Sequence, residues 1–467
     1  MKSNTSKLVK NSALLMIGNF SSKLLVFLLV PFYTSVLSTE EYGISDILVT
    51  TINLIYPILS LMIETAVLRF CLDENPDRKT VFSTALWINM IGFSVLVPLA
   101  VAIIPHTTLK DYLPYFLGYY VTHTAYVILM NYTKGIGKVS YYSITSVLNT
   151  AIVIFCNLLF LLQLKIGVQG YLLSMIIGYL VSSAFIIIAT KAWRDVALPG
   201  KLDSDLTKKM IKYSLPLIPN SLSWWISNSS DRYILAFFRS MSDVGIYTVS
   251  YKIPSIITVV SNILMNAWEI SAVDDFGTEK NRLFFSKMYR NYLNLQIICC
   301  AIIMVLVKPL AVILFQKDFY DAWLFVPALL YASIFNTLNN FVGTVFTAAK
   351  KTKSLFTTTL IGALVNIGLN FCLIPFWGAQ GAAVATAISY ITIYVLRMIK
   401  SSKIIKLDIN MFDNVLKLVL VGGLAVAACI NTIASVVLCV VILILEYKFI
   451  ANLVTAIISK LRKKLKK

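Results

Sequence analysis

Residues 167–170 read Gly-Val-Gln-Gly, and residues 378–381, 211 positions later, read Gly-Ala-Gln-Gly. Each motif stands between two apolar runs that are long enough to cross a bilayer as helices. A second set of identities, in which Gly43 corresponds to Gly245, has a constant offset of 202 residues. Two consistent offsets between similarly placed runs predict that the chain contains a duplicated set of helices.

The composition is that of a membrane protein. Of the 467 residues, 58% are hydrophobic and 13% are charged, and the mean hydropathy is +0.79. Since a spanning helix needs about 20 apolar residues, the chain has room for about fourteen spans and for little folded structure outside the membrane. The composition therefore excludes a soluble enzyme, a disulfide-stabilised secreted module and a receptor with a large ectodomain.

Fourteen apolar runs of spanning length predict an all-α polytopic membrane protein. The runs begin near Ser12, Ile44, Phe82, Leu113, Ser143, Gly170, Ile211, Gly245, Tyr292, Ala322, Leu355, Gly381, Phe412 and Ile433. We expect a six-helix bundle over residues 1–200, a second over residues 201–408, and two extra helices with a basic tail over residues 409–467. Because each half has an even number of spans, the two halves are predicted to be parallel repeats.

Basic residues are distributed unevenly along the chain. With the N-terminus in the cytoplasm, 32 of the 41 Lys and Arg residues, Arg397 among them, fall in cytoplasmic segments, against 6 in outer loops. This bias predicts that both termini are cytoplasmic. It also explains most of the net charge of +19, so we expect no nucleic acid as a partner. The basic tail at residues 461–467 is expected to rest on anionic membrane lipids.

Several polar residues lie inside the predicted spans. The first span carries Asn19 and Lys23, and the seventh carries Asn228 among several serines before Asp231 and Arg232. A charge at the bilayer centre costs at least about 2.5 to 3.5 kcal/mol, so ionisable residues at such depths usually mark a cavity or a pathway. Both spans are too polar to face lipid.

The ionisable residues suggest ion pairs near the helix ends. We expect Glu64 to pair with Arg69 at the cytoplasmic end of the second span. Asp231 is expected to pair with a neighbouring cation, either Arg232 or Lys252 of the eighth span. Such pairs either gate a pathway or only fix the packing of helices.

The other polar and aromatic residues of these spans determine the expected charge and lining of the cavity. Lys23 has no acidic residue near it in the sequence, so the cavity is expected to be net positive and to favour an anionic substrate. Its side chain has an alternative, which is to snorkel or to bond a backbone carbonyl. Glu269 is placed like Glu64 and is given the same structural or gating role. Trp224 and Trp225 either stack on sugar rings or pack between helices.

The sequence contains no motif for nucleotide binding. Gly137-Lys138 is followed by Val139, so the phosphate-binding loop is missing its hydroxyl residue. No outer loop is long enough for a catalytic domain, and no cysteine spacing indicates a metal site. We therefore predict no catalytic residue, cofactor or metal, and transport driven by an ion gradient, the membrane potential or substrate mass action.

Three stretches, taken in order with the two glycine-flanked turns, carry a family resemblance. Residues 64–70 read Glu-Thr-Ala-Val-Leu-Arg-Phe, residues 231–235 read Asp-Arg-Tyr-Ile-Leu, and residues 251–254 read Tyr-Lys-Ile-Pro. The chain resembles the polysaccharide-transport (Wzx-type) flippases of the multidrug/oligosaccharidyl-lipid/polysaccharide (MOP) exporter superfamily. The resemblance implies two six-helix bundles around a cationic cavity. It further implies alternating access that carries an undecaprenyl-pyrophosphate-linked oligosaccharide to the outer leaflet of the bacterial plasma (inner) membrane.

The resemblance lets us assign roles to the intramembrane residues. Lys23 and Lys252 would neutralise the pyrophosphate. Arg69 and Arg232 would guide it at the two mouths of the cavity. The residues expected to bind substrate are Asn19, Lys23, Arg69, Trp224, Trp225, Asn228, Arg232 and Lys252. A coupling ion (H⁺ or Na⁺) and a glycan polymerase are the other expected partners.

Two other functions stay open from the sequence. A multidrug exporter of organic cations would share the fold, but it needs an unpaired buried carboxylate near the midplane. Glu64, Asp231 and Glu269 all lie toward helix ends. A membrane polymerase or ligase for the same glycolipids would need a sizeable outer loop, which the predicted topology lacks.

Overall fold

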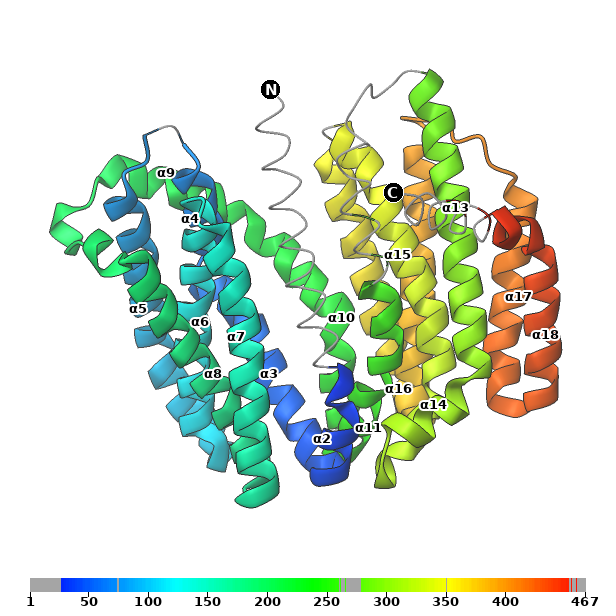
Figure 1. Ribbon diagram of the computed structural model, residues 1–467, viewed down its shortest axis with the longest axis horizontal. Coiled ribbons are helices and arrows are strands. Elements are labelled where there is room, and N and C mark those ends of the chain that lie inside the picture. Colours follow the sequence, from blue (N-terminus) through cyan, green and yellow to red (C-terminus); the bar gives the residue numbers. More distant parts are fainter. Residues whose placement is uncertain are drawn as a thin grey trace. The chain divides into compact units, whose positions relative to one another are not determined.

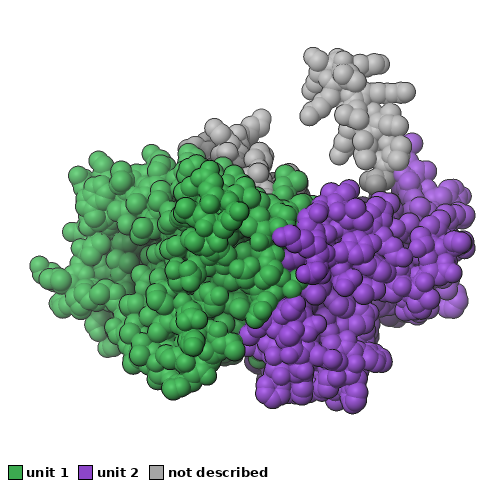
Figure 2. All heavy atoms as spheres, turned by 90° about the horizontal axis from the view of Figure 1, so that it is seen from below, with its two compact units in different colours: residues 1–229 green, residues 230–467 purple. Residues whose placement is uncertain are grey.

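The computed structural model describes most of the chain, and every regular element in the described part is a helix (Figure 1). The described residues are 27–73, 75–259, 261, 265, 279–349, 351–452, 455 and 459. The chain divides into two compact units, residues 1–229 and residues 230–467 (Figure 2). The helical, membrane-spanning character expected from the sequence is confirmed, whereas the repeat boundaries at residues 200 and 408 stay predictions.

Unit 1 is a bundle of helices joined by short turns. Its helices are α2 (Val30–Val36), α3 (Thr39–Leu59), α4 (Ile63–Cys71), α5 (Arg78–Ile103), α6 (Leu113–Gly135), α7 (Val139–Asn157), α8 (Gly167–Thr190), α9 (Ser204–Ser214) and most of α10 (Ile218–Phe238). A core lies where α4, α5 and α6 meet, and there Ile63, Phe82 and Tyr132 are almost fully buried. Burial of these large apolar side chains holds the three helices together.

Unit 2 is a second bundle, which takes in the last turns of α10. Its other helices are α11 (Met241–Ser250), α13 (Glu279–Val305), α14 (Val307–Leu314), the 3₁₀ segment η7 (Lys317–Leu324), α15 (Val326–Ala348), α16 (Thr352–Ser401), α17 (Met411–Ile430) and α18 (Thr432–Leu445). Most residues of α15 are buried, because α13, α16 and α17 pack around it. The centre of unit 2 is therefore α15.

The described helices are long and apolar enough to make this a polytopic membrane protein. Seven of them, within the described residues, could cross a bilayer by length and composition. The number becomes eight if η7 and α15, which are bent by 55° relative to each other, count as one span. The expected total of fourteen spans and the cytoplasmic termini stay predictions.

Two helices that are 202 residues apart in the sequence begin with the same capping interaction. The Ser38 hydroxyl accepts a hydrogen bond from the Glu41 N–H at 3.1 Å, and the Glu41 carboxylate accepts one from the Ser38 N–H at 2.8 Å. At the start of α11, the Ser240 hydroxyl accepts from the Asp243 N–H, also at 3.1 Å. Such caps satisfy N–H groups that a helix leaves without a partner in its first turn.

Asp77 fixes the start of α5 outside the membrane-spanning segment. Its carboxylate accepts a hydrogen bond from the Thr80 N–H at 3.1 Å. Hydrogen bonding from Thr80 holds the pKa of Asp77 below its usual range. The carboxylate is therefore charged at neutral pH, as suits the positive end of the helix dipole.

Both Gly-x-Gln-Gly motifs begin with a glycine that has a positive φ angle. Gly167 has φ +49° and Gly378 has φ +55°, a region that side chains disfavour. Gly378 interrupts α16 with a ψ of −134°. There, the Arg239 guanidinium donates a hydrogen bond to the Pro375 carbonyl at 2.9 Å, and so satisfies an acceptor that the break leaves without its helical partner.

A partly buried ion cluster links the last two helices to the bundle. The Lys417 ammonium of α17 lies 2.6 Å from the Glu446 carboxylate and 2.9 Å from the Asp413 carboxylate. It also donates a hydrogen bond to the Asn294 side chain of α13 at 3.4 Å. Because the Glu446 side chain is only 2% exposed, loss of Lys417 would leave a buried charge without its partner.

We predict that Gly378→Ala destabilises the protein by about 1 to 2 kcal/mol, because a Cβ disfavours the left-handed backbone at this turn. The matched control is Gly423→Ala in α17, where a Cβ would meet nothing within 4 Å. That substitution should be neutral or stabilise the helix by up to about 1 kcal/mol. Thermal unfolding of the detergent-purified variants makes the comparison. Equal melting temperatures for the two variants would contradict the assignment of strain to Gly378.

Candidate functional site

The Asp231 carboxylate is almost fully buried in unit 2, with only 1% of the residue exposed. It accepts hydrogen bonds from the Tyr247 hydroxyl at 2.7 Å and from the Tyr251 hydroxyl at 3.1 Å. Hydrogen bonds to an ionised acceptor are about twice as strong as neutral ones. Two tyrosines of the next helical segment therefore hold this carboxylate in place.

Arg232 completes what we call the Asp231 cluster, which consists of Asp231, Arg232, Tyr247, Thr248 and Tyr251. The Arg232 Nη1 lies 3.8 Å from the Asp231 carboxylate, so the expected contact is present as a long ion pair. Its Nε donates a hydrogen bond to the Thr248 hydroxyl at 3.2 Å, and its Cζ lies 5.1 Å from the centre of the Tyr251 ring. The guanidinium is thus oriented by hydroxyl and aromatic groups.

A chain of neutral polar side chains continues from α10 to α16. The Ser230 hydroxyl donates to the Asn366 side chain at 3.3 Å, and the Asn370 amide donates to the same oxygen at 2.9 Å. The Asn366 amide lies 3.5 Å from the Thr386 hydroxyl. Sequence reasoning missed Asn366 and Asn370, although their spacing of four residues in an apolar run was a usable signal.

Arg397 is a buried cation. The charge count placed it in a cytoplasmic segment, which stays a prediction; the structure places it in the last turns of α16, where it is only 3% exposed. Its Nη1 donates to the Asn339 carbonyl at 2.6 Å, and its Nε and Nη2 donate to the Thr358 and Thr359 hydroxyls at 3.2 and 3.0 Å. These acceptors make the burial of the guanidinium tolerable. No carboxylate of the described residues lies within 4.0 Å of it.

Glu64 is buried in unit 1, and its expected ion pair with Arg69 is wrong. The Arg69 side chain is 54% exposed and instead pairs with Asp73 at 2.5 Å. Five positions along a helix place two side chains about 140° apart, whereas four positions place them on one face. Glu64 is 5% exposed, and no Lys, Arg or His nitrogen in the described part of the chain lies within 4.0 Å of it.

Trp225 of α10 contacts a neighbouring helix, and Asn228 bonds within its own helix. The Trp225 indole N–H donates a hydrogen bond to the Thr50 carbonyl of α3 at 2.9 Å. The Asn228 amide donates to the Trp224 carbonyl one turn earlier, at 2.6 Å. Trp224, Trp225 and Asn228 are all half-buried. Their predicted contacts with sugar stay predictions.

The other predicted site residues are placed only in part. Lys252 is half-buried and directly follows Tyr251 of the Asp231 cluster. Asn19, Lys23 and Glu269 lie outside the described residues, and their roles stay predictions. Within the described ranges, no three His, Cys, Asp or Glu side chains are grouped so that they could hold a metal ion.

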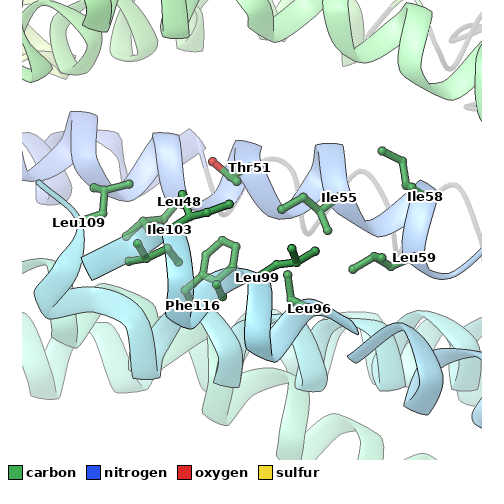
Figure 3. A pocket seen from close by; sticks show the side chains of 12 residues that line it. Leu48, Thr51, Ile55, Ile58, Leu59, Leu96, Leu99, Ile103, Leu109 and Phe116 are labelled. Atoms are coloured by element: carbon green, nitrogen blue, oxygen red, sulfur yellow. The ribbon is translucent and has the colours of Figure 1, made fainter. Parts of the chain in front are cut away.

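An apolar groove of about 400 Å³ lies between α3, α5 and α6 of unit 1 (Figure 3). Leu48, Leu99 and Phe116 are among the side chains that point into it. Thr51 contributes the one polar side chain of this lining, and its hydroxyl donates to the Ile47 carbonyl of its own helix at 2.6 Å. The groove therefore suits hydrocarbon and offers nothing that would bind a phosphate.

A family model described as "Polysaccharide biosynthesis protein" matches residues 8–268. This chain belongs to that family. The match confirms the resemblance that the sequence motifs carried. This chain is similar in sequence to an uncharacterized membrane protein of Methanocaldococcus jannaschii. It is 24% identical over 417 residues, which are 83% of this chain and 96% of that protein.

Solved structures show that this member of the family has the fold of the MOP superfamily. The lipid II flippase MurJ in an inward closed conformation aligns with a TM-score of 0.67 at 14% identity, over 93% of this chain and 99% of that one. An inward-facing multidrug resistance MATE family transporter aligns with a TM-score of 0.61 at 13% identity, over 82% and 95%. A MOP superfamily transporter from Pyrococcus furiosus aligns with a TM-score of 0.58 at 15% identity, over 85% and 95%.

We predict that Trp225→Phe lowers the stability of the protein by about 0.5 to 1.5 kcal/mol, since it removes one partly buried hydrogen bond and keeps an aromatic ring. Trp193→Phe is the matched control, because Trp193 is 50% exposed. Thermal unfolding of both variants in detergent measures the effect. If the two variants melt at the same temperature, the bond to the Thr50 carbonyl does not stabilise the packing of α10 on α3.

Proposed function

We propose that this protein is a flippase for undecaprenyl-pyrophosphate-linked oligosaccharide in the bacterial plasma membrane. The headgroup would cross from the cytoplasmic to the outer leaflet by alternating access, while the hydrocarbon tail stays in lipid. The observation that carries the proposal is the family match over residues 8–268, whose description is polysaccharide biosynthesis. The fold similarity to a lipid II flippase over 93% of the chain supports it.

The proposed topology is the one predicted from the sequence. The protein would have fourteen spans with both termini in the cytoplasm, arranged as two parallel six-helix repeats and a C-terminal pair. The shared caps at Ser38 and Ser240, and the positive φ angles of Gly167 and Gly378, support a duplication. Parallel repeats of this kind place the substrate near the membrane midplane and rock around it.

Basic residues would recognise the pyrophosphate. Lys23 and Lys252 would neutralise it, and Arg232 would guide it from within the Asp231 cluster. Arg69 would meet it first at the cytoplasmic end, where an exposed ion pair with Asp73 costs little to exchange. The half-buried Trp224 and Trp225 and the amides of Asn19 and Asn228 would contact the sugars, and Glu64, Asp231 and Glu269 would fix or gate the helices.

The membrane potential and a coupling ion would drive the transport of this anionic headgroup. A negative headgroup that moves outward gains about 2.3 kcal/mol per charge for each 100 mV of membrane potential. A coupling ion, H⁺ or Na⁺, would supply the rest. Anionic lipids would bind the basic tail, and a glycan polymerase would receive the product. The class is a transporter and not an enzyme.

One observation favours a second candidate, an exporter of organic cations with the same fold. Such an exporter needs a buried carboxylate without a basic partner, and Glu64 has this environment within the described residues. We place it second because the family description concerns polysaccharide and not drug export.

Thermal stabilisation of the purified protein distinguishes the two candidates. A polyprenyl-pyrophosphate glycan at about 100 times its Kd should stabilise the protein by about 2.7 kcal/mol. Arg232→Ala should reduce that stabilisation, whereas Arg282→Ala, which removes a partly exposed side chain paired with Glu279, should not. Stabilisation by lipophilic cations together with no response to the glycolipid would overturn the flippase proposal.

A further inference from the structure

The membrane segment formed by α3 and α4 is broken at residues 60–62. Leu61 and Met62 both have φ +54°, although neither is glycine. Bulky side chains rarely adopt this left-handed conformation, and consecutive residues that do so need support from their surroundings. A broken span within a membrane is usually retained where it serves a site or a motion.

Ser60 connects this break to a buried carboxyl group. Its hydroxyl oxygen accepts a hydrogen bond from the Met62 N–H at 3.2 Å. The same hydroxyl donates to the Glu64 carboxylate at 3.5 Å, a long hydrogen bond. Ser60 is fully buried and Glu64 is 5% exposed. The protonation of Glu64 therefore affects the group that caps the broken backbone.

Polar groups from two other helices surround Glu64. The Tyr56 hydroxyl of α3 and the Tyr120 hydroxyl of α6 are close enough to interact electrostatically with its carboxylate. Both oxygens are buried and, within the described part of the chain, meet no hydrogen-bond partner under normal geometry. His123 of α6 packs edge-on against the Tyr56 ring, with centroids 5.4 Å apart, and its Nδ1 is likewise buried and unpaired.

The remaining helices that pack on α4 supply no counter-charge. Neither α5 nor α9 places a described Lys, Arg or His nitrogen within 4.0 Å of Glu64. Instead, α5 presses on the break, because a Cβ on Gly92 would lie 2.5 Å from the Leu59 carbonyl oxygen. The far end of α4 contacts α9 through Phe70, whose ring centroid lies 6.0 Å from that of Tyr213.

We propose that Glu64 is a proton-binding site that switches the conformation of the break at residues 60–62. When ionised, the carboxylate accepts a hydrogen bond from the Ser60 hydroxyl and lies near the Tyr56 and Tyr120 hydroxyls, and the oriented Ser60 oxygen caps the Met62 N–H. When Glu64 takes a proton from water, its new O–H competes for the Ser60 oxygen, and the cap on Met62 is released. One buried carboxyl surrounded by hydroxyl donors suits a proton better than a metal cation, which needs several more oxygen ligands. The inference rests on the proposed function, in which this proton is the coupling ion.

Hydrogen exchange of the backbone amides of residues 61–65 tests the switch without substrate. In the purified full-length chain, exchange corrected for intrinsic rates should be at least about tenfold faster at about pH 5.5 than at about pH 8. Glu64→Gln should exchange at the fast rate at both pH values, and so should Ser60→Ala. Glu279→Gln, which alters an 81% exposed carboxylate, should behave like the parent.

Three results would overturn the proposal. They are a parent protein whose exchange does not change with pH, a Glu64→Gln variant that keeps the change, and a rate that follows Na⁺ concentration at fixed pH. Glu64→Asp keeps a titratable group and covers the case in which Glu64→Gln does not fold, since it should retain the pH response with a shifted midpoint. A protein that shows the switch but does not respond to glycolipid would refute the flippase function and leave the proton site standing.

Discussion

The cost of a charge inside a bilayer is the constraint on which the rest of the structure depends. The protein meets it by holding each described buried charge with groups from neighbouring helices. Two tyrosine hydroxyls hold Asp231, and two threonine hydroxyls and a helix carbonyl hold Arg397. Two carboxylates hold Lys417. These interactions add directional contacts to the apolar packing of the helices.

Neutral partners stabilise a buried charge but do not cancel it. Unit 1 therefore keeps an acidic group, Glu64, and unit 2 keeps a basic one, Arg397, each without an oppositely charged partner within 4.0 Å in the part of the chain that the structure describes. In the proposed function this difference in sign is useful. A cation taken up in one unit and a phosphorylated headgroup recognised by basic residues can then act on different helices of the same protein.

Sequence reasoning predicted the helices better than the contacts between them. Helices α5, α6 and α17 begin within about four residues of the expected starts, because apolar runs of this length have no other stable conformation in a membrane. The predicted ion pair between Glu64 and Arg69 is wrong because residues that are close in sequence need not lie on the same face of a helix. The burial of Arg397 could not be predicted because its acceptors come from residues 38 to 58 positions away. The break at Leu61 had one usable signal, Pro57, which removes a helical hydrogen bond one turn earlier.

Transport of a fluorescent polyprenyl-pyrophosphate glycan by the full-length protein in sealed vesicles tests the central claim most directly. The account predicts that the protein exposes glycolipid from the opposite leaflet to a membrane-impermeant quencher, faster than protein-free vesicles do. It also predicts that an inside-negative potential accelerates outward movement, because the headgroup is an anion. A rate equal to that of empty vesicles, alongside export of a lipophilic cation by the same preparation, would contradict it.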